Sequence, residues 1–171
     1  MPNWCMNTLV IRGTKKQREE FKTKYCSLIK KEYSDHEVLS LDFNKIIPEP
    51  KVIEECPEAY ILHNKEEASR EFLAWNEEDP RKWFNWYRWR LNNWGVKWNC
   101  DPCAHKETRT GLWLHFDTAW GPPIGVIRRL IIDNYNLKIK CSFDEPGMDI
   151  HGLMSYEDFD EEEIKNLKEG K

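Results

Sequence analysis

Tryptophan is concentrated in one short stretch of this chain. Residues 83–98, WFNWYRWRLNNWGVKW, contain five of its nine tryptophans. Asp79 can cap a helix and Pro80 can occupy its first position, while Gly95 is the residue type most able to adopt the left-handed conformation just past a helix end. The stretch therefore predicts a helix from about residue 80 to 94.

A helix in this position has two contrasting faces. At about 100° per residue, one face carries Trp83, Trp86, Tyr87, Arg90 and Trp94, and the other carries Asn85, Arg88, Trp89 and Asn92. Aromatic residues at helical spacing usually pack into a core, which is one interpretation. The arginine inside the aromatic face supports a second interpretation, a site for a planar or anionic ligand. From the residues alone, both interpretations stay open.

The composition is that of a globular protein. The 171 residues are 40% hydrophobic and 33% charged, with 8 glycines, and this length favours a single domain over residues 1–171. The net charge of −4 disfavours generic nucleic-acid binding, which depends on many lysine and arginine contacts. No apolar run reaches the roughly 18 residues of a membrane span, and the amino terminus lacks the layout of a signal peptide. We therefore expect a cytoplasmic protein with no membrane partner.

The six cysteines are expected to be reduced thiols, because nothing indicates export and their spacing is irregular. Cys100, Cys103 and His105 form the one local cluster, a CxxC knuckle that could supply three zinc ligands. A closed zinc site needs a fourth ligand, and no second knuckle provides one. We therefore keep these three residues as weak metal candidates, and expect neither a bound metal nor a cofactor.

The order of predicted elements is α+β. Residues 4–12 predict a central strand, because neither of their two alternating faces is clearly polar. The other predictions are a helix at 14–32, strands at 38–47, 95–100 and 112–117, a polar hairpin loop at 101–111, a helix at 124–131, strands at 137–143 and 150–156, and an acidic tail from about 157. Right-handed crossovers would build these into a split βαβ antiparallel sheet of the ferredoxin-like type, with helices on one face. Residues 51–94 would be a helical insertion whose helix could fold over the other face.

Three motifs resemble those of one protein family. They are MPNWCMNTL at residues 1–9, NWGVKW at 93–98 and TAWGPP at 118–123, and together they resemble the YubB-like proteins of bacteriophages and plasmids. Val96 and Gly121 depart from the family pattern, in which threonine and serine are usual. The resemblance implies a ferredoxin-like fold and a cytoplasmic accessory protein of a mobile element. It implies no particular activity, because that family has none established.

No set of residues qualifies as a catalytic centre. The five histidines are scattered, and His115 and Asp117 on one strand face are more typical of a hydrogen-bonded surface pair. We therefore expect binding without catalysis, through the site residues Trp4, Arg90, Trp94, Trp98, Trp113, His115 and Trp120. Tryptophan and arginine are favoured anchors of protein interfaces, so the expected partner is a host protein, bound in a counter-defence role. The alternative is a nucleotide or a single-stranded nucleic acid stacked on the sheet aromatics.

Overall fold

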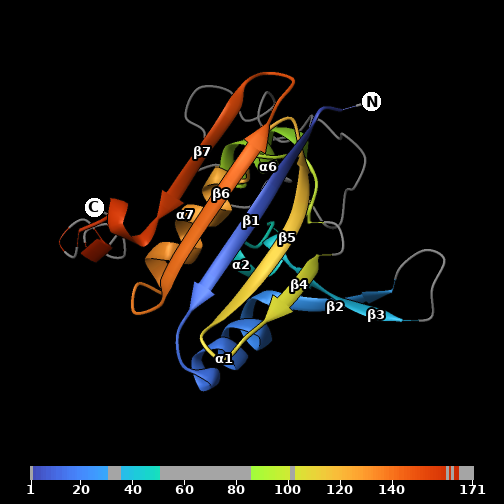
Figure 1. The fold of residues 1–171 in the computed structure, drawn as a ribbon. Coiled ribbons are helices and arrows are strands. Elements are labelled where there is room, and N and C mark those ends of the chain that lie inside the picture. Colours follow the sequence, from blue (N-terminus) through green and yellow to red (C-terminus); the bar gives the residue numbers. More distant parts are fainter. Residues whose placement is uncertain are drawn as a thin grey trace, which may run out of the picture.

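A five-stranded antiparallel sheet forms the centre of the protein (Figure 1). The computed structural model describes residues 2–30, 36–50, 86–100, 103–160, 162, 164 and 165. The strand order is β4-β5-β1-β6-β7, with β1 at Trp4–Arg12, β4 at Ala104–Glu107, β5 at Gly111–Ala119, β6 at Lys138–Glu145 and β7 at Ile150–Ser155. β1 lies in the middle of the sheet, as the sequence predicts.

The connections between these strands have the split βαβ pattern. β5 and β6 are both antiparallel to β1, which lies between them, and the helix α7 (Ile124–Asp133) joins them. In the same way β1 and β4 flank β5. The helix α1 (Lys15–Tyr25) follows β1 directly. The predicted fold class, a ferredoxin-like α+β sheet with helices on one face, is confirmed, with β7 added at one edge.

The segment between α1 and β4 contains more than helices. A hairpin of β2 (Cys26–Lys30) and β3 (Glu37–Leu41) forms a second, two-stranded sheet. It is followed by the short helix α2 (Phe43–Ile46) and by α6 (Trp86–Asn93). A short 3₁₀ helix, η1 (Tyr156–Asp158), follows β7. In Figure 1 the strands of the main sheet lie in front of α2, α6 and α7.

Four predicted segments differ from the structure, two in where they end and two in their secondary structure. The helix predicted at 14–32 ends at Tyr25, because residues 26–30 pair with β3 instead. The strand predicted at 38–47 ends at Leu41, because the Asp42 carboxylate accepts from the N–H of Asn44 and caps α2. The strand predicted at 95–100 is irregular, and there the Asn99 side chain rather than a neighbouring strand accepts the N–H of Phe43. The hairpin loop predicted at 101–111 contains β4.

One face of the main sheet packs against the helices. Leu9, Leu114 and Ile139 are completely buried on three adjacent strands, and they face the apolar side of α7, where Leu130 and Ile131 are equally buried. Alternate residues of a strand point to opposite faces, so the neighbours of these residues lie on the other face of the sheet. That face carries exposed side chains, including Met6 and His115. The described part of α6 packs on the helix side, against the buried cluster, and not over the other face.

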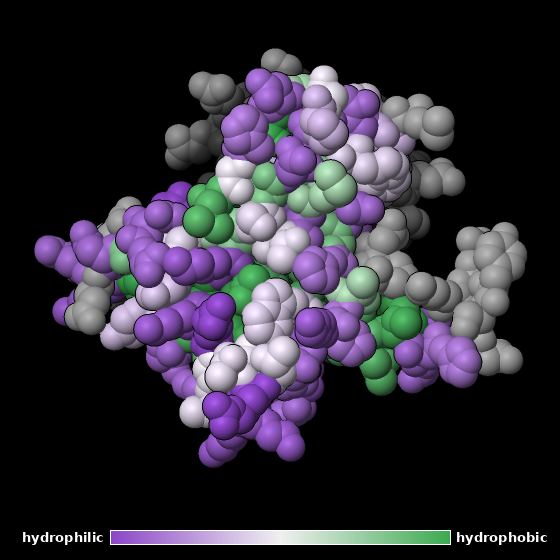
Figure 2. Space-filling view, viewed as in Figure 1, coloured by the Kyte–Doolittle hydropathy of each residue, from purple (hydrophilic) through white to green (hydrophobic). Residues whose placement is uncertain are grey.

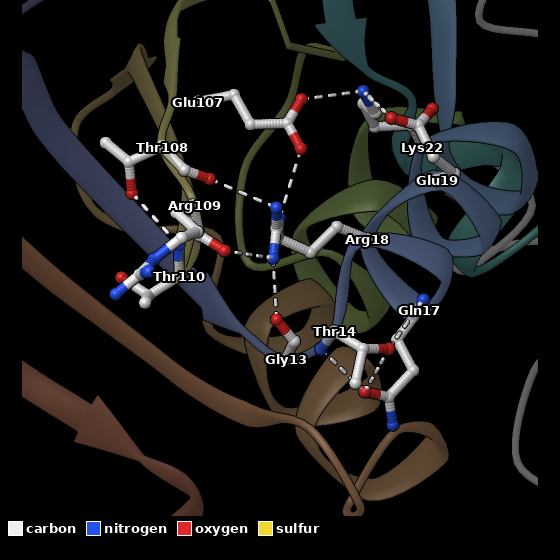
Figure 3. Close-up of polar contacts among 10 residues, drawn as sticks. All are labelled: Gly13, Thr14, Gln17, Arg18, Glu19, Lys22, Glu107, Thr108, Arg109 and Thr110. Atoms are coloured by element: carbon white, nitrogen blue, oxygen red, sulfur yellow. Dashed lines mark hydrogen bonds and ion pairs between the residues drawn. The ribbon is translucent and has the colours of Figure 1, made fainter.

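A buried arginine ties α1 to the β4–β5 turn (Figure 3). Arg18 Nη1 and Nη2 donate to the carbonyls of Gly13 at 2.6 Å, Arg109 at 3.3 Å and Thr108 at 3.0 Å. Its Nε pairs with Glu107 Oε1 at 3.1 Å, although the Arg18 side chain is only 3% exposed. Each of the three nitrogens of this guanidinium therefore donates to an acceptor, as a buried charge requires.

The Arg18 cluster is expected to make stability depend on pH. Hydrogen bonds from Lys22 and then from Arg18 lower the pKa of Glu107 below its ordinary value of 4.5. A lowered folded-state pKa means that this contribution is complete above the ordinary value and is lost as the pH falls below it. We expect the change in unfolding free energy between pH 6 and about pH 3 to be smaller in Glu107→Gln than in the parent protein, as measured by denaturant unfolding. An equal change in both proteins would contradict this.

Candidate functional site

The three sequence motifs meet at one end of the main sheet. Trp4 in β1 pairs in register with Ala119 in β5, and the N–H of Trp120 donates to the carbonyl of Asn3 at 2.9 Å. Trp120 adopts a φ of 73°, a left-handed conformation that is uncommon for a residue other than glycine. The 93–98 motif joins the other two through the turn before α7. Motifs that are far apart in sequence therefore build one region.

Two of the motifs are linked by a buried polar network. The amide Nδ2 of Asn7 donates to Thr118 Oγ1 at 2.8 Å and to the carbonyl of Cys5 at 2.9 Å. Thr118 Oγ1 in turn donates to the carbonyl of Gly121 at 2.7 Å. A buried polar group without partners is costly, so this network fixes β1 against the turn that follows β5. Asn7 of the first motif and Thr118 of the third motif therefore have a structural role.

Two glycines let the second and third motifs approach closely. Gly95 has a φ of 90°, and a Cβ atom there would lie 3.0 Å from the backbone nitrogen of Ile124. A Cβ atom at Gly125 would overlap the carbonyl oxygen of Asn93. The end of α6 can therefore touch the start of α7 only because these two positions lack side chains.

Gly125→Ala is expected to lower the free energy of unfolding by about 1–3 kcal/mol, the usual cost of overpacking a closely packed contact. The added methyl group would push the end of α6 away from α7. Gly121→Ala is the matched control, since no atom lies within 4 Å of a Cβ atom built there, and it should change stability by less than about 0.5 kcal/mol. Chemical denaturation measures both, and equal effects of the two variants would contradict the close approach.

Three tryptophans are half-exposed in this region. Trp4 is 42% exposed, Trp98 is 41% exposed and Trp120 is 46% exposed. The rings of Trp4 and Trp98 lie side by side, with centroids 6.2 Å apart and planes tilted by 33°. Lys97 Nζ lies 3.8 Å from the centroid of the Trp98 ring, which is a cation–π contact. The structure thus brings together two of the predicted site residues from distant motifs.

A hollow of about 530 Å³ lies beside Trp4 on the sheet face opposite the described helices. We call it the tryptophan hollow. Its described lining includes Trp4, Met6, Thr8, Ala104, His115 and Asp117. In the same orientation as Figure 1, hydrophobic and intermediate residues are interspersed with hydrophilic ones across the middle of this face (Figure 2). The lining of the hollow therefore combines an aromatic ring, Trp4, with polar groups.

The polar groups of the tryptophan hollow come from β1 and β5. His115 Nδ1 lies 3.0 Å from Thr8 Oγ1, so the two side chains share a hydrogen bond across the strands. The exposed carboxylate of Asp117 forms no hydrogen bond or ion pair with any residue that the structure describes. Trp113 lies further along β5 on the same face, with the Arg12 guanidinium 5.9 Å from its ring centroid.

Arg90 and Trp94 lie in the interior and not at the tryptophan hollow. Arg90 forms a two-pronged pair with Glu49, from Nε at 2.5 Å and from Nη2 at 2.9 Å. Its guanidinium carbon lies 5.0 Å from the Trp86 ring centroid and 4.9 Å from that of Trp94. Trp94 is completely enclosed, and its Nε1 donates to the carbonyl of Ile47 at 2.9 Å.

The predicted faces of the tryptophan helix are partly wrong. Trp89, predicted to face away, is buried and packs edge-on against Trp94, with ring centroids 5.8 Å apart. Tyr87, predicted to face inward, is exposed. Within the described part the helix runs from Trp86 to Asn93, and the buried tryptophans are Trp89 and, just past the helix end, Trp94. Trp83 and the predicted helix start lie outside the described residues.

The five cysteines that the structure describes are buried, and burial raises the pKa of several of their thiols. Burial raises the pKa of Cys5 to about 11 and the pKa of Cys26 to about 12. Cys100 and Cys103 lie with their Sγ atoms 3.3 Å apart, and that hydrogen bond together with burial raises the pKa of Cys100. His105 is exposed on β4. Over the described ranges, no three side chains of His, Cys, Asp or Glu are arranged to hold a metal ion.

The sequence predicted two of the residues that line the tryptophan hollow, Trp4 and His115, but not Met6, Thr8 and Asp117. The period of two along each strand places Met6 and Thr8 on the Trp4 side of β1, and Asp117 on the His115 side of β5. This alternation could have identified Met6, Thr8 and Asp117 as residues of the same face. It could not predict the register of β1 and β5, which places Thr8 opposite His115 and Met6 opposite Asp117.

Comparison with known proteins supports the ferredoxin-like fold and indicates no activity. Residues 94–171 match a family described as a ferredoxin-like domain in Api92-like protein. The match spans β4 to β7 and covers just under half of the chain. No curated protein and no solved structure matches the chain. Among the described helices, none is long and apolar enough to cross a membrane.

Proposed function

We propose that this protein binds a partner protein through the tryptophan hollow and does not catalyse a reaction. The observation that carries the proposal is the pair of half-exposed rings, Trp4 and Trp98, side by side where the three motifs meet. Tryptophan is enriched among the residues that contribute most to protein interfaces, because it buries a large area against a partner. The adjoining hollow supplies the concave surface that such an interface needs.

The chemistry of the described side chains supports binding over catalysis. A reactive cysteine must be available as a thiolate, whereas the thiols of Cys5, Cys26 and Cys141 have pKa values raised to between about 11 and about 12 by burial. His115, the histidine of the tryptophan hollow, shares a hydrogen bond with Thr8, but no carboxylate of the described residues pairs with its ring, as a nucleophile–histidine–acid triad would require. Arg90, the other predicted site residue with a charge, is engaged by Glu49.

The proposal also includes the biological context in which the protein would act. The resemblance of the three motifs to YubB-like proteins supports an accessory protein of a bacteriophage or plasmid, working in the cytoplasm of the host cell. The partner would then be a host factor, which the protein occupies in a counter-defence role.

Single-stranded nucleic acid is the second candidate ligand. It is favoured by the position of Trp4 and Trp113 on the uncovered face of an antiparallel sheet, the surface on which stacked bases are bound in other folds. Asp117 and Asp144 oppose it, because these exposed carboxylates flank Met6 in register on the same face and would repel phosphates. The net charge of −4 acts in the same direction.

We therefore expect weak binding to a mixed-sequence single-stranded oligonucleotide, with a dissociation constant above about 1 μM in about 150 mM salt. Fluorescence anisotropy measures it. A sub-micromolar constant that is lost in Trp4→Ala would replace the proposed function by the nucleic-acid alternative.

The proposed function is tested by affinity capture followed by a binding measurement. The protein is used to retain proteins from bacterial lysate, and the retained protein is purified and titrated by calorimetry. Trp4→Ala should weaken that complex at least about 30-fold, as expected for an interface anchor, with an unchanged melting temperature. Tyr135→Ala, which removes an exposed aromatic outside the hollow, is the control. Equal affinities for the parent protein and Trp4→Ala would refute the proposal.

A further inference from the structure

We propose that the tryptophan hollow recognises an arginine side chain of the partner, whose guanidinium stacks on Trp4 and pairs with Asp117. This inference rests on the proposed function, since it specifies what the partner presents at the same site. It follows from three features of the hollow: its rings, its unpaired carboxylate and the charge around it.

The interior of the protein already contains the arrangement that we infer for the complex. There the Arg90 guanidinium lies about 5 Å from the rings of Trp86 and Trp94 and forms two hydrogen bonds with the carboxylate of Glu49. The tryptophan hollow offers the same kinds of group, with the Trp4 ring and the Asp117 carboxylate in its lining and the Trp98 ring beside Trp4, but no arginine among its described lining residues. An arginine from outside would complete the set.

The rings of the tryptophan hollow suit a cation. Lys97 already places its ammonium group 3.8 Å from the centroid of Trp98, and the neighbouring Trp4 ring is half-exposed. A positive group over the face of a tryptophan is attracted by the negative charge of that face. Of the two cationic side chains, arginine is planar and can stack on a ring while its fork of N–H groups reaches a carboxylate. The geometry therefore favours guanidinium over ammonium.

Asp117 supplies the counter-charge. It is exposed, lines the hollow and has no hydrogen bond or ion pair with the described part of the chain. Its neighbour in the hollow, His115, is bonded to Thr8 and so is already engaged. On the other side of Met6, Asp144 adds a second negative charge to the same face. A phosphate would meet both carboxylates, whereas a guanidinium would be attracted by them.

The experiment uses three small probes: methylguanidinium, methylammonium and the neutral methylurea, which has nearly the same shape as methylguanidinium. Each is titrated into ¹⁵N-labelled protein, up to the highest concentration that does not lower the melting temperature. The indole N–H signals of Trp4 and Trp98 are followed, and they are assigned with Trp4→Phe and Trp98→Phe. We expect saturable shifts of these two signals with methylguanidinium, at least about fivefold weaker binding of methylammonium, and no saturable shift with methylurea.

Asp117→Asn should weaken the binding of methylguanidinium at least about fivefold. Asp144→Asn is the matched control, because it removes a carboxylate from the same face, also opposite Met6, but outside the lining of the hollow. It should reduce binding less than about twofold.

Equal binding of methylurea and methylguanidinium, or of methylammonium and methylguanidinium, would overturn the inference, and so would the absence of any shift at Trp4. None of these results would change the interpretation of the capture experiment. Loss of partner affinity in Trp4→Ala would still support the proposed function. Conversely, capture that is insensitive to Trp4→Ala would refute the proposed function even if the hollow binds methylguanidinium.

Discussion

Replacing Arg18 by alanine is expected to lower the free energy of unfolding by about 3–5 kcal/mol, as breaking a buried ionic arrangement does. The variant loses an ion pair to Glu107 and three hydrogen bonds to the carbonyls of Gly13, Thr108 and Arg109 (Figure 3). Those carbonyls form the junction between α1 and the β4–β5 turn, and the side chain that satisfies them is almost completely buried. Urea denaturation, followed by tryptophan fluorescence, measures the change.

Arg109→Ala is the control for Arg18→Ala. Arg109 belongs to the same turn, but its side chain is exposed and forms no ion pair with residues in the described ranges. Its replacement should change stability by less than about 0.5 kcal/mol. If Arg18→Ala unfolds at the same urea concentration as the parent protein, Arg18 does not anchor the turn. Lys22→Ala should have an intermediate effect, because Lys22 contacts Glu107 at 2.9 Å from a more exposed position.

The role of Arg18 could not be predicted from its place in the sequence. It lies in the run KKQREEFKTKY of α1, where charged residues usually face water. Three of its four acceptors, on Glu107, Thr108 and Arg109, come from β4 and the turn after it, about ninety residues later in the chain. The helix itself was predictable at its start, since Thr14 and Gln17 form the capping box that their spacing indicates.

The fold was predictable where each strand has a clear pattern. β5 alternates between buried Leu112, Leu114 and Phe116 and the opposite face, and the apolar spacing of α7 is equally regular. Prediction failed at β2, because Leu28 and Ile29 fit the apolar face of a helix as well as a strand. The segment forms a strand because Leu28 and Ile29 pair with Leu39 and Val38. The spacing of apolar residues within the segment does not reveal this pairing.

The candidate site was predictable in its residue types more than in its grouping. The sequence indicated tryptophans and one arginine as binding residues, but did not separate the rings on the surface from those in the core. The distinction depends on where α6 packs. Trp94 lies between Phe43 and Trp89 with its N–H bonded to Ile47, whereas Trp98 lies beyond the helix end and meets Trp4.

Arg90→Ala is the second large expected effect, a loss of about 3–5 kcal/mol of unfolding free energy. Arg90 is only 23% exposed, and Glu49, which it pairs through two hydrogen bonds, is 7% exposed. The variant would leave that carboxylate buried without its described cationic partner. It would also remove the guanidinium from between the rings of Trp86 and Trp94 and from the carbonyl of Lys97. Both the ion pair and the packing of α6 would be weakened.

Two further variants separate these contributions. Glu49→Gln combined with Arg90→Ala should be less destabilised than the sum of the single variants, because the charge that the alanine leaves unpaired is then absent. Arg90→Lys keeps the charge but not the two-pronged geometry, so it should recover only part of the stability. Arg129→Ala is the control: the Arg129 side chain, paired with Asp133, is 54% exposed, and its replacement should cost less than about 0.5 kcal/mol.

Thermal unfolding of Arg90→Ala decides between a structural residue and a site residue. The structural role predicts a melting temperature several degrees lower, since about 1 kcal/mol corresponds to about 2–4 °C in a chain of this size. An unchanged melting temperature, within about one or two degrees, would mean that the Arg90–Glu49 pair does not stabilise the fold. Arg90 would then be the first residue to replace in binding assays. Because its guanidinium is held by Glu49 and by two rings at once, we expect the lower melting temperature.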